Sequence, residues 1–463
     1  MQFWFGDLAL TRVLLQRGLA AIYLLAFWCV IRQFRPLLGE RGLLPVPDFL
    51  QRVTFREAPS LFHFRYSDRL LAGVGWAGLG LSVLAVTGVS ERGPLWLSLA
   101  VWLTLYVLYL SIVNVGQTFY GFGWESMLLE AGFFAAFLGP RDLAPSLVPV
   151  LALRWMLFRV ELGAGLIKLR GDACWRDLTC LYYHHETQPL PNPLSSYFHH
   201  VPKRLHRAGV AFSHFVQLVV PFGLFGPEPV AALAGVLIIV HQLVLIVSGN
   251  YAWLNWLTVV LAFSAFSDRV WRRLLPLGAG ELAARATLFQ WLLYALGAAT
   301  LGLSIKPTLN LFSKQQAMNA SYNSLHLVGS YGAFGSVTRQ RYELILEGSL
   351  DASDSPNPTW REYEFKAKPG DPARRPGQFA PYHLRLDWLM WFLPLRAVVT
   401  ERGVMVGRQP LWFSRLIDKL LEADAATLAL LGPDPFEGQP PRQIRGSLYR
   451  YELVSPRERR RAG

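Results

Sequence analysis

The sequence predicts an α-helical polytopic membrane domain of eight or nine spans over residues 1–303, followed by a smaller β-rich soluble C-terminal domain over residues 304–463. Of its 463 residues, 52% are hydrophobic and 16 are Trp, a composition that is rare among water-soluble proteins. Apolar runs of about 17 to 25 residues, long enough to cross a bilayer, recur until about Ile305. Beyond that point, alternating polar and apolar residues indicate strands.

Seven apolar runs predict clear membrane spans, at 14–31, 71–89, 95–114, 147–168, 209–226, 229–249 and 283–302. Two further runs are less clear. Residues 122–139 carry Glu125 and Glu130, and residues 251–266 are short and follow a tight SGN turn. The first of these is buried by its neighbours or re-entrant if it does not cross.

The formal net charge of +13 comes mainly from Arg in loops and tails, which is typical of segments beside anionic lipid headgroups. No nucleic-acid recognition motif or sustained basic helix accompanies this charge, so we expect membrane lipid and not nucleic acid as a partner.

The segment 153–177 is the most informative part of the chain, because it is apolar enough to cross a bilayer and yet contains charges. Arg154, Glu161 and Lys168 are spaced seven residues apart, which places them on one stripe of a helix. Arg159 points elsewhere. A charge inside a span costs about 2.5 to 3.5 kcal/mol, so such side chains face a protein interior or a wet cavity.

Two interpretations of these charges remain open at this stage. They can form interhelical ion pairs that fix the bundle, for example with Glu125 and Glu130 of the neighbouring segment. Alternatively, the stripe binds a ligand or performs catalysis.

The polar loop 169–208 contains Cys174 and Cys180, whose spacing permits a disulfide in an oxidising compartment. Two free thiols are the alternative. Nearby His184 and His185 raise the possibility of zinc, but no C-x-x-C or H-x-x-x-H spacing supports it, so we assign no metal.

Two His-His pairs lie in this loop, His184-His185 and His199-His200. Neutral imidazoles near pH 7 can act as bases or ligands. In an aromatic, Pro-rich loop over a helix bundle, a structural role in hydrogen bonding to backbone groups is the favoured interpretation.

Beyond residue 305, YELILEGSL, REYEFKAK and SLYRYELV are predicted strands. HLRLDWLMWFLPL, with Trp388 and Trp391, is a predicted helix that lies at the membrane interface or packs against the strands. The last segment, PRERRRAG, is a basic tail predicted to be disordered.

Several long strings in this chain resemble the lipase maturation factor family. They include YGFGWESMLLEAGF, the RGDACWRDLTC string with Asp172, Trp175, Arg176 and Asp177, the HHETQPLPNP string with Glu186 and Asn192, and the His199-His200 pair that follows it. The resemblance covers most of the chain from about residue 110 onward. This chain has HHET at residues 184–187, where the family has HYET.

This resemblance implies a multi-pass membrane protein of the endoplasmic reticulum, with a lumenal C-terminal domain, that helps secreted lipases fold and assemble into active dimers. The expected partners are therefore lipase-like secreted clients. The compact length is more similar to a bacterial relative, for which the expected location is the cytoplasmic (inner) membrane with a periplasmic C-terminal domain.

A shorter string, GLIKLRGDACW, is similar to the segment that carries the active-site lysine of vitamin K-dependent gamma-carboxylases. That similarity implies an alternative function, a membrane enzyme with Lys168 as base and with Glu161, His184 and His185 as further catalytic candidates. Glu161 on the same stripe instead favours a salt bridge to a charged Lys168. The leading prediction is a maturation factor without a cofactor.

The arginines of the short loops predict a cytoplasmic N-terminus, whereas the Lys and Arg count of the two long loops favours the opposite orientation; we follow the short loops and the family resemblance. With nine crossings, the loop 169–208 and the C-terminal domain then face the lumen or periplasm.

Overall fold

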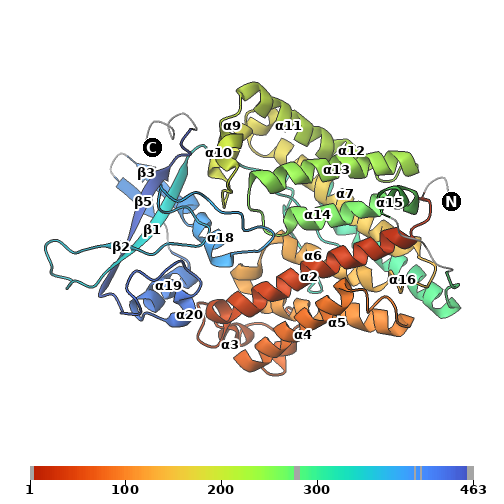
Figure 1. Cartoon of the computed structure of the whole chain (residues 1–463), viewed down its shortest axis with the longest axis horizontal. Helices are drawn as coiled ribbons and strands as arrows, with labels where there is room; N and C mark the ends of the chain where they lie inside the picture. The colour runs from red at the N-terminus through yellow and green to blue at the C-terminus, as the bar shows by residue number, and fades with distance from the viewer. Residues whose placement is uncertain (1–4, 276–281, 401–402, 407–408, 456–463) are drawn as a thin grey trace.

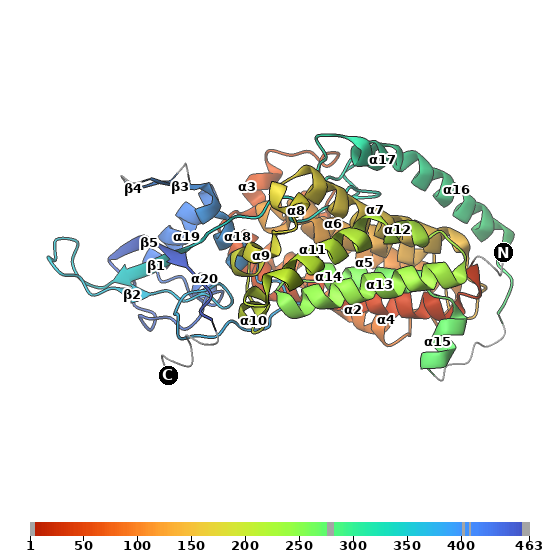
Figure 2. The same cartoon turned by 90° about the horizontal axis from the view of Figure 1, so that it is seen from above.

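The computed structural model describes residues 5–275, 282–400, 403–406 and 409–455. Long helices run side by side in a bundle, and a smaller unit of strands and short helices is attached to one end of it (Figures 1 and 2). The N-terminus lies at the opposite end of the bundle from this unit (Figure 2). We call residues 5–312 the helical bundle and residues 341–455 the C-terminal unit.

The principal bundle helices are α2 (Ala9–Leu38), α4 (Asp68–Val86), α5 (Leu95–Val115), α6 (Gly123–Ala136), α7 (Leu147–Arg170), α11 (Lys203–Leu218), α13 (Glu228–Ser248), α14 (Leu254–Ala262) and α16 (Thr287–Leu303). Shorter helices connect them: α3 (Val46–Leu50), α8 (Ala173–Arg176), α9 (Leu181–Thr187), α10 (Ser195–His199), α12 (Val220–Gly223), α15 (Asp268–Leu274) and α17 (Ile305–Phe312).

Each of the nine apolar runs predicted from the sequence coincides with one of the principal helices. Within the described residues, five helical segments are long and apolar enough to cross a membrane: α2, α4, α5, α13 and the continuous stretch Thr287–Phe312. The remaining helices are short, as α6 and α14 are, or carry several charges, as α7 does. A helical membrane bundle is therefore confirmed, while the count of eight or nine crossings stays a prediction.

Local capping explains where α7 starts and stops. The Ser146 hydroxyl accepts a hydrogen bond from the Val148 amide at its start, and Gly171 follows its last turn. Between these two ends, α7 carries four charged residues that are all buried in the bundle: Arg154, Arg159, Glu161 and Lys168.

The segment 313–340, which we call the strap, runs from α17 to the C-terminal unit and crosses α7. A side chain at Gly163 would collide with the Tyr331 carbonyl, and one at Gly171 with the Gly335 carbonyl. Glycine at these two positions therefore permits the close packing of the strap on α7.

The C-terminal unit contains an antiparallel three-stranded sheet in the order β2-β1-β5. Its strands are β1 (Arg341–Ser349), β2 (Arg361–Glu362) and β5 (Gln443–Tyr451), with Leu344 opposite Leu448. A hairpin of β3 (Ala397–Thr400) and β4 (Gly403–Val406) and the helices α18 (Arg385–Phe392), α19 (Leu411–Leu421) and α20 (Ala425–Leu428) complete the described part.

Two of the three predicted strands are confirmed, and the third is much shorter than predicted. REYEFKAK forms a strand only at Arg361–Glu362. The amides of Ala367 and Lys368 instead donate to the Asp387 carboxylate at 2.7 and 3.0 Å, which removes them from the sheet. The basic tail PRERRRAG lies outside the described residues.

The Trp-rich helix α18 packs against the helical bundle. Trp388 is buried against Trp124 of α6, with ring centroids 5.1 Å apart. Trp391 donates to the Thr187 carbonyl at 3.1 Å. The helix thus joins the C-terminal unit to the bundle.

Candidate functional site

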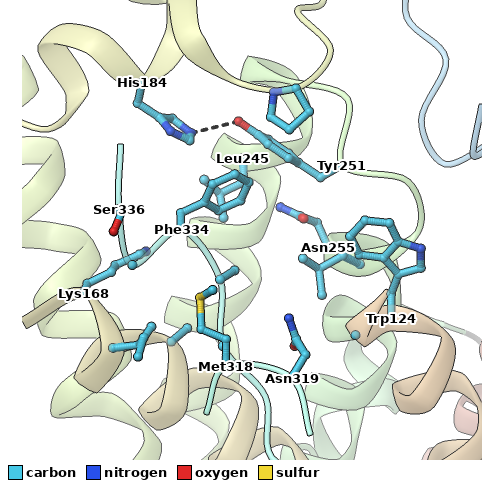
Figure 3. Close-up of a pocket in the computed structure, with 18 of the residues that line it drawn as sticks. Trp124, Lys168, His184, Leu245, Tyr251, Asn255, Met318, Asn319, Phe334 and Ser336 are labelled. Atoms are coloured by element: carbon cyan, nitrogen blue, oxygen red, sulfur yellow. Dashed lines mark hydrogen bonds between the residues drawn. The ribbon is translucent and has the colours of Figure 1, made fainter. Parts of the chain in front are cut away.

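A cavity of about 1230 Å³ extends from the interior of the bundle to the C-terminal unit. Its walls come from α6, α7, α9, α11, α13, α14, the strap, α18 and the start of α19. Figure 3 shows lining residues from α6, α7, α9, α13, α14 and the strap. All four catalytic candidates of the sequence analysis, Glu161, Lys168, His184 and His185, line this cavity.

Lys168 reaches the cavity from the last turns of α7. Its Nζ donates to Gln217 Oε1 at 2.8 Å and to Ser213 Oγ at 3.4 Å. It also lies 4.8 Å from the ring centroid of Trp175, a cation–π distance. Lys168 is thus held by neutral groups of α11 and by an aromatic ring.

Glu161 lies two turns before Lys168 on the same helix and is fully buried. Its Oε1 accepts from Gln242 Nε2 at 2.7 Å, whereas its Oε2 has no hydrogen-bond partner among the described residues. No ion pair joins Glu161 to Lys168 or Arg154 within the part of the chain that the structure describes. The salt bridge favoured by the sequence analysis is therefore wrong, because the Lys168 ammonium is hydrogen-bonded to side chains of α11 and the Glu161 carboxylate to Gln242 of α13.

His241 completes a group of six polar residues that we call the polar cluster: Glu161, Lys168, Ser213, Gln217, His241 and Gln242. His241 Nε2 lies 3.2 Å from Ser213 Oγ, and its Nδ1 is buried without a partner in the described structure. All six residues of the cluster line the cavity, as do Phe334, Trp388 and Trp391.

Arg154, the third member of the predicted stripe, does not line the cavity. Its Nε donates to the Ser264 carbonyl at 2.6 Å and its Nη1 to the Leu224 carbonyl at 3.3 Å. Arg154 therefore binds backbone carbonyls at the ends of neighbouring helices.

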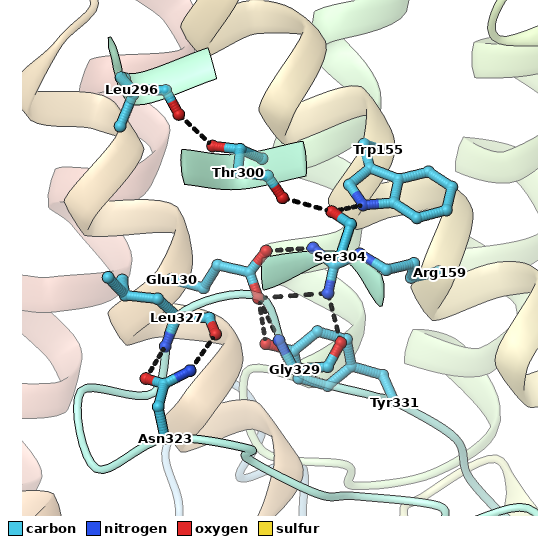
Figure 4. Close-up of polar contacts among 10 residues, drawn as sticks. All are labelled: Glu130, Trp155, Arg159, Leu296, Thr300, Ser304, Asn323, Leu327, Gly329 and Tyr331. Carbon is cyan, nitrogen blue, oxygen red and sulfur yellow. Dashed lines mark hydrogen bonds and ion pairs between the residues drawn. The ribbon is translucent and has the colours of Figure 1, made fainter. Parts of the chain in front are cut away.

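Arg159 forms the buried ion pair that the sequence analysis considered for this segment. Its guanidinium binds Glu130 of α6 and the Gly329 carbonyl of the strap (Figure 4). Glu130 Oε2 also accepts from the Gly329 amide at 3.0 Å and from the Tyr331 hydroxyl at 2.7 Å. This network joins α6, α7 and the strap.

Glu125, the other acid of α6, pairs with a residue of the C-terminal unit and with none in α7. Arg385 Nη1 lies 2.7 Å from Glu125 Oε1, and the Tyr109 hydroxyl binds the other carboxylate oxygen. Gln33 of α2 accepts from the Arg385 amide at 3.0 Å. These contacts fasten the C-terminal unit to the bundle.

In the loop 169–208, Cys174 and Cys180 are joined by a disulfide, with their Cα atoms 4.7 Å apart. Asp172 begins α8 by accepting from the Cys174 amide at 3.0 Å, and it pairs with Arg339 at 2.7 Å. The hydrogen bond from Arg339 lowers the pKa of Asp172 to about 2. Trp175 donates to the Phe334 carbonyl at 2.9 Å.

Of the remaining predicted residues of this string, Arg176 is exposed and donates to the Leu169 carbonyl at 2.8 Å, and Asp177 is exposed. Neither lines the cavity.

The first histidine pair lies beside the cavity. His184 Nε2 lies 2.9 Å from the Tyr251 hydroxyl (Figure 3), and burial lowers the pKa of His184 to about 3. Burial also lowers the pKa of His185, whose Nδ1 has no partner in the described structure. Both imidazoles are therefore neutral near pH 7.

The second pair lies away from the cavity. His199 Nε2 is 3.6 Å from Glu186, and His200 Nδ1 hydrogen-bonds the Ser196 carbonyl at 2.7 Å. Asn192 is buried and donates to the Val247 carbonyl at 2.9 Å. Among the described residues, no three His, Cys, Asp or Glu side chains gather as a metal-binding group.

A buried group of β1 holds this loop to the C-terminal unit. Arg341 donates to the carbonyls of Glu186 and Pro189 at 3.1 and 2.9 Å, and it pairs with Glu343. Lys368 pairs with the same carboxylate at 3.0 Å. These buried contacts pack the loop 169–208 against the C-terminal unit.

Four residues of the polar cluster were not predicted from the sequence as site residues: Ser213, Gln217, His241 and Gln242. A signal was present, because VLIIVHQLVLIV places two polar side chains in the middle of an otherwise apolar run. Polar side chains at such a depth usually face a bundle interior.

Comparison with known proteins covers nearly the whole chain. Residues 10–273 match the family described as "Lipase maturation factor transmembrane domain", and residues 327–463 match "Lipase maturation factor C-terminal domain". Lipase maturation factor 1 of Bos taurus is 42% identical over 97% of this chain and 85% of the relative, and that of Homo sapiens is 41% identical over 97% and 84%.

A more distant relative, lipase maturation factor 2 of Rattus norvegicus, is 28% identical over 96% of this chain and 80% of its own. No solved structure matches. The transmembrane description agrees with the five apolar helices, so the protein is an integral membrane protein. The chain belongs to the lipase maturation factor family.

Proposed function

We propose that this chain is a membrane-embedded maturation factor that helps secreted lipases to fold. The observation that carries the proposal is the 42% identity to a lipase maturation factor over 97% of the chain, which includes the bundle and the C-terminal unit together. The carboxylase alternative gains no support from the relatives, which are named as maturation factors.

We further propose that the loop 169–208 and the C-terminal unit face the compartment where the client folds. This compartment is the lumen of the endoplasmic reticulum in a eukaryote, or the periplasm in a bacterium. The disulfide between Cys174 and Cys180 supports an oxidising environment. The loop and the C-terminal unit also share one end of the bundle, opposite the N-terminus (Figure 2).

Exposed aromatic residues at this end are suited to bind a client. Phe64 is 80% exposed and Phe55 is 49% exposed, and their ring centroids lie 5.8 Å apart. Their loop is held to the C-terminal unit, because Arg415 of α19 donates to the Leu43 carbonyl at 3.3 Å. Exposed apolar side chains on a fixed base can bind the unburied apolar surface of an incompletely folded protein.

Expression in cells that lack their own lipase maturation factor tests this function. The chain is co-expressed with a secreted lipase, and lipase activity in the medium is divided by lipase mass. We expect the ratio to rise several-fold with the parent chain. An unchanged ratio, with the chain present and folded in the membrane, would contradict a maturation role for the lipase used.

Replacement of Phe55 and Phe64 by Ser tests the proposed client contact in the same cells. We expect a lower ratio with unchanged amounts of folded membrane protein. The matched control is Val89→Ser, an exposed apolar residue at the other end of the bundle that is 47% exposed. Equal effects of the two changes would reject the aromatic contact.

A further inference from the structure

We propose that the cavity beside the polar cluster is a binding site for an uncharged lipid, with hydroxyl and ester carbonyl groups on long hydrocarbon chains, as in diacylglycerol. This inference goes beyond the proposed function, because it concerns a ligand of the membrane protein itself and not its client.

The size of the cavity favours a ligand as large as a lipid. Its volume of about 1230 Å³ exceeds the roughly 300 to 1,000 Å³ that is usual for small-molecule sites. Most of its wall is apolar, with Phe212, Leu245, Phe334, Trp388 and Phe392 among the lining residues. Such a wall accommodates hydrocarbon chains without leaving polar groups unsatisfied.

Buried polar atoms without a partner in the described structure occur at several places on the cavity wall, and two of them belong to the polar cluster, where we place the head of the ligand. Glu161 Oε2, His241 Nδ1 and Asn255 Nδ2 are buried and have no hydrogen-bond partner among the described residues. All three residues line the cavity. Buried polar groups are nearly always hydrogen-bonded, so a ligand with donors and acceptors completes this arrangement.

The charges of the polar cluster favour a ligand with an uncharged head. Among the side chains that the structure describes, Glu161 and Lys168 are the only Asp, Glu, Lys or Arg that line the cavity, and their formal charges cancel. A ligand hydroxyl can donate to Glu161 Oε2. Lys168 has three N–H donors, of which two bind Gln217 and Ser213, so the third can bind a ligand carbonyl.

The route of entry favours a lipid from the bilayer. Leu205 of α11 and Val244 of α13 line the cavity and are also 60% and 45% exposed on the outer surface. The outer face of α13, a candidate membrane span, is apolar, with Val240 and Leu243 exposed. We therefore place the entry route of the lipid beside α13, whose apolar outer face suits contact with the bilayer.

Binding of labelled dioleoylglycerol to the full chain, purified in mild detergent and stripped of lipid, tests the proposal. We expect saturable binding of one dioleoylglycerol molecule per chain. Oleate and a dioleoyl phospholipid should displace it only at a concentration roughly tenfold or more above that of unlabelled dioleoylglycerol. A roughly tenfold difference in affinity corresponds to about one hydrogen bond. Stronger binding of oleate would overturn the uncharged head. No saturable binding of any of the three lipids would leave water as the occupant and overturn the lipid site.

Two variants locate the binding in the cavity. Ala164 lines the cavity one turn from Glu161, so Ala164→Phe fills the space and should abolish binding. Glu161→Gln keeps the side-chain size and should weaken dioleoylglycerol binding roughly tenfold by loss of one charged acceptor. The matched control, Leu301→Phe on the exposed face of α16, should bind as the parent does.

Parental binding by Glu161→Gln and Ala164→Phe together would overturn the assignment to this cavity. The thermal unfolding of each variant is measured in parallel. Glu161→Gln keeps the test decisive if Ala164→Phe fails to fold. The assay contains no lipase, so its result is independent of the result for client maturation.

Discussion

Two buried glutamates of the bundle, Glu130 and Glu161, show how similar residues acquire different roles. Both side chains are fully buried, and both place a carboxyl group inside a membrane bundle. Glu130 has a cationic partner, Arg159, and both of its carboxylate oxygens accept hydrogen bonds. Glu161 has one neutral partner and one free oxygen beside a large cavity.

Burial alone therefore does not decide whether a charged residue stabilises the fold or belongs to a binding site. The Glu130 network joins three segments by hydrogen bonds to both carboxylate oxygens, so it stabilises the fold. The Glu161 side chain faces an open volume with incomplete hydrogen bonding, which costs free energy unless a ligand or water completes it.

The largest expected effect is the loss of one partner from the Glu130 network. Arg159→Met should lower the free energy of unfolding by about 3 to 5 kcal/mol, because it leaves a buried carboxylate without its cation. Thermal unfolding of the detergent-solubilised protein measures this change. The double variant with Glu130→Leu should recover part of the loss, and a parental unfolding temperature for Arg159→Met alone would reject the architectural role.

Removal of the disulfide should have a smaller effect. Replacing Cys174 and Cys180 by Ser should destabilise the protein by about 2 kcal/mol, since the bond closes a short loop. Because this loop carries Trp175, whose ring contacts Lys168, we expect client maturation to fall more than the amount of folded protein. Alkylation of both thiols in the native parent, at full activity, would show that the bond does not form.

Acidification should destabilise the protein through His184, which lines the cavity. Its pKa in the folded protein is about 3, below the usual value of about 6.5 in the unfolded chain. The contribution of neutral His184 to the free energy of unfolding is therefore fully present above pH 6.5 and is lost as the pH falls toward 3. At pH 5 the loss should be about 2 kcal/mol.

Unfolding of the parent and of His184→Phe between pH 7.5 and pH 5 measures this contribution. At pH 5 the variant should take up fewer protons on unfolding than the parent, by up to one proton, so that its stability depends less steeply on pH. Identical pH profiles for the two proteins would show that His184 is protonated in the folded state or remains hydrated.

The sequence predicts the parts of this account that depend on local patterns. Apolar length predicts the bundle helices, and the seven-residue spacing predicts that Glu161 and Lys168 share a face of α7. The partners were not predictable in this way. Arg385 lies 260 residues from Glu125, and Gln242 lies 81 residues from Glu161, so only the three-dimensional packing brings them together.

The most direct test of the account compares Glu130→Gln with Glu161→Gln in one detergent by equilibrium or thermal unfolding. Both changes keep the side-chain size and remove one buried charge. We predict a loss of about 3 kcal/mol or more for Glu130→Gln, which leaves Arg159 without its anion, and a change below about 1 kcal/mol for Glu161→Gln. Equal losses for the two variants would contradict the division between an architectural ion pair and a ligand site.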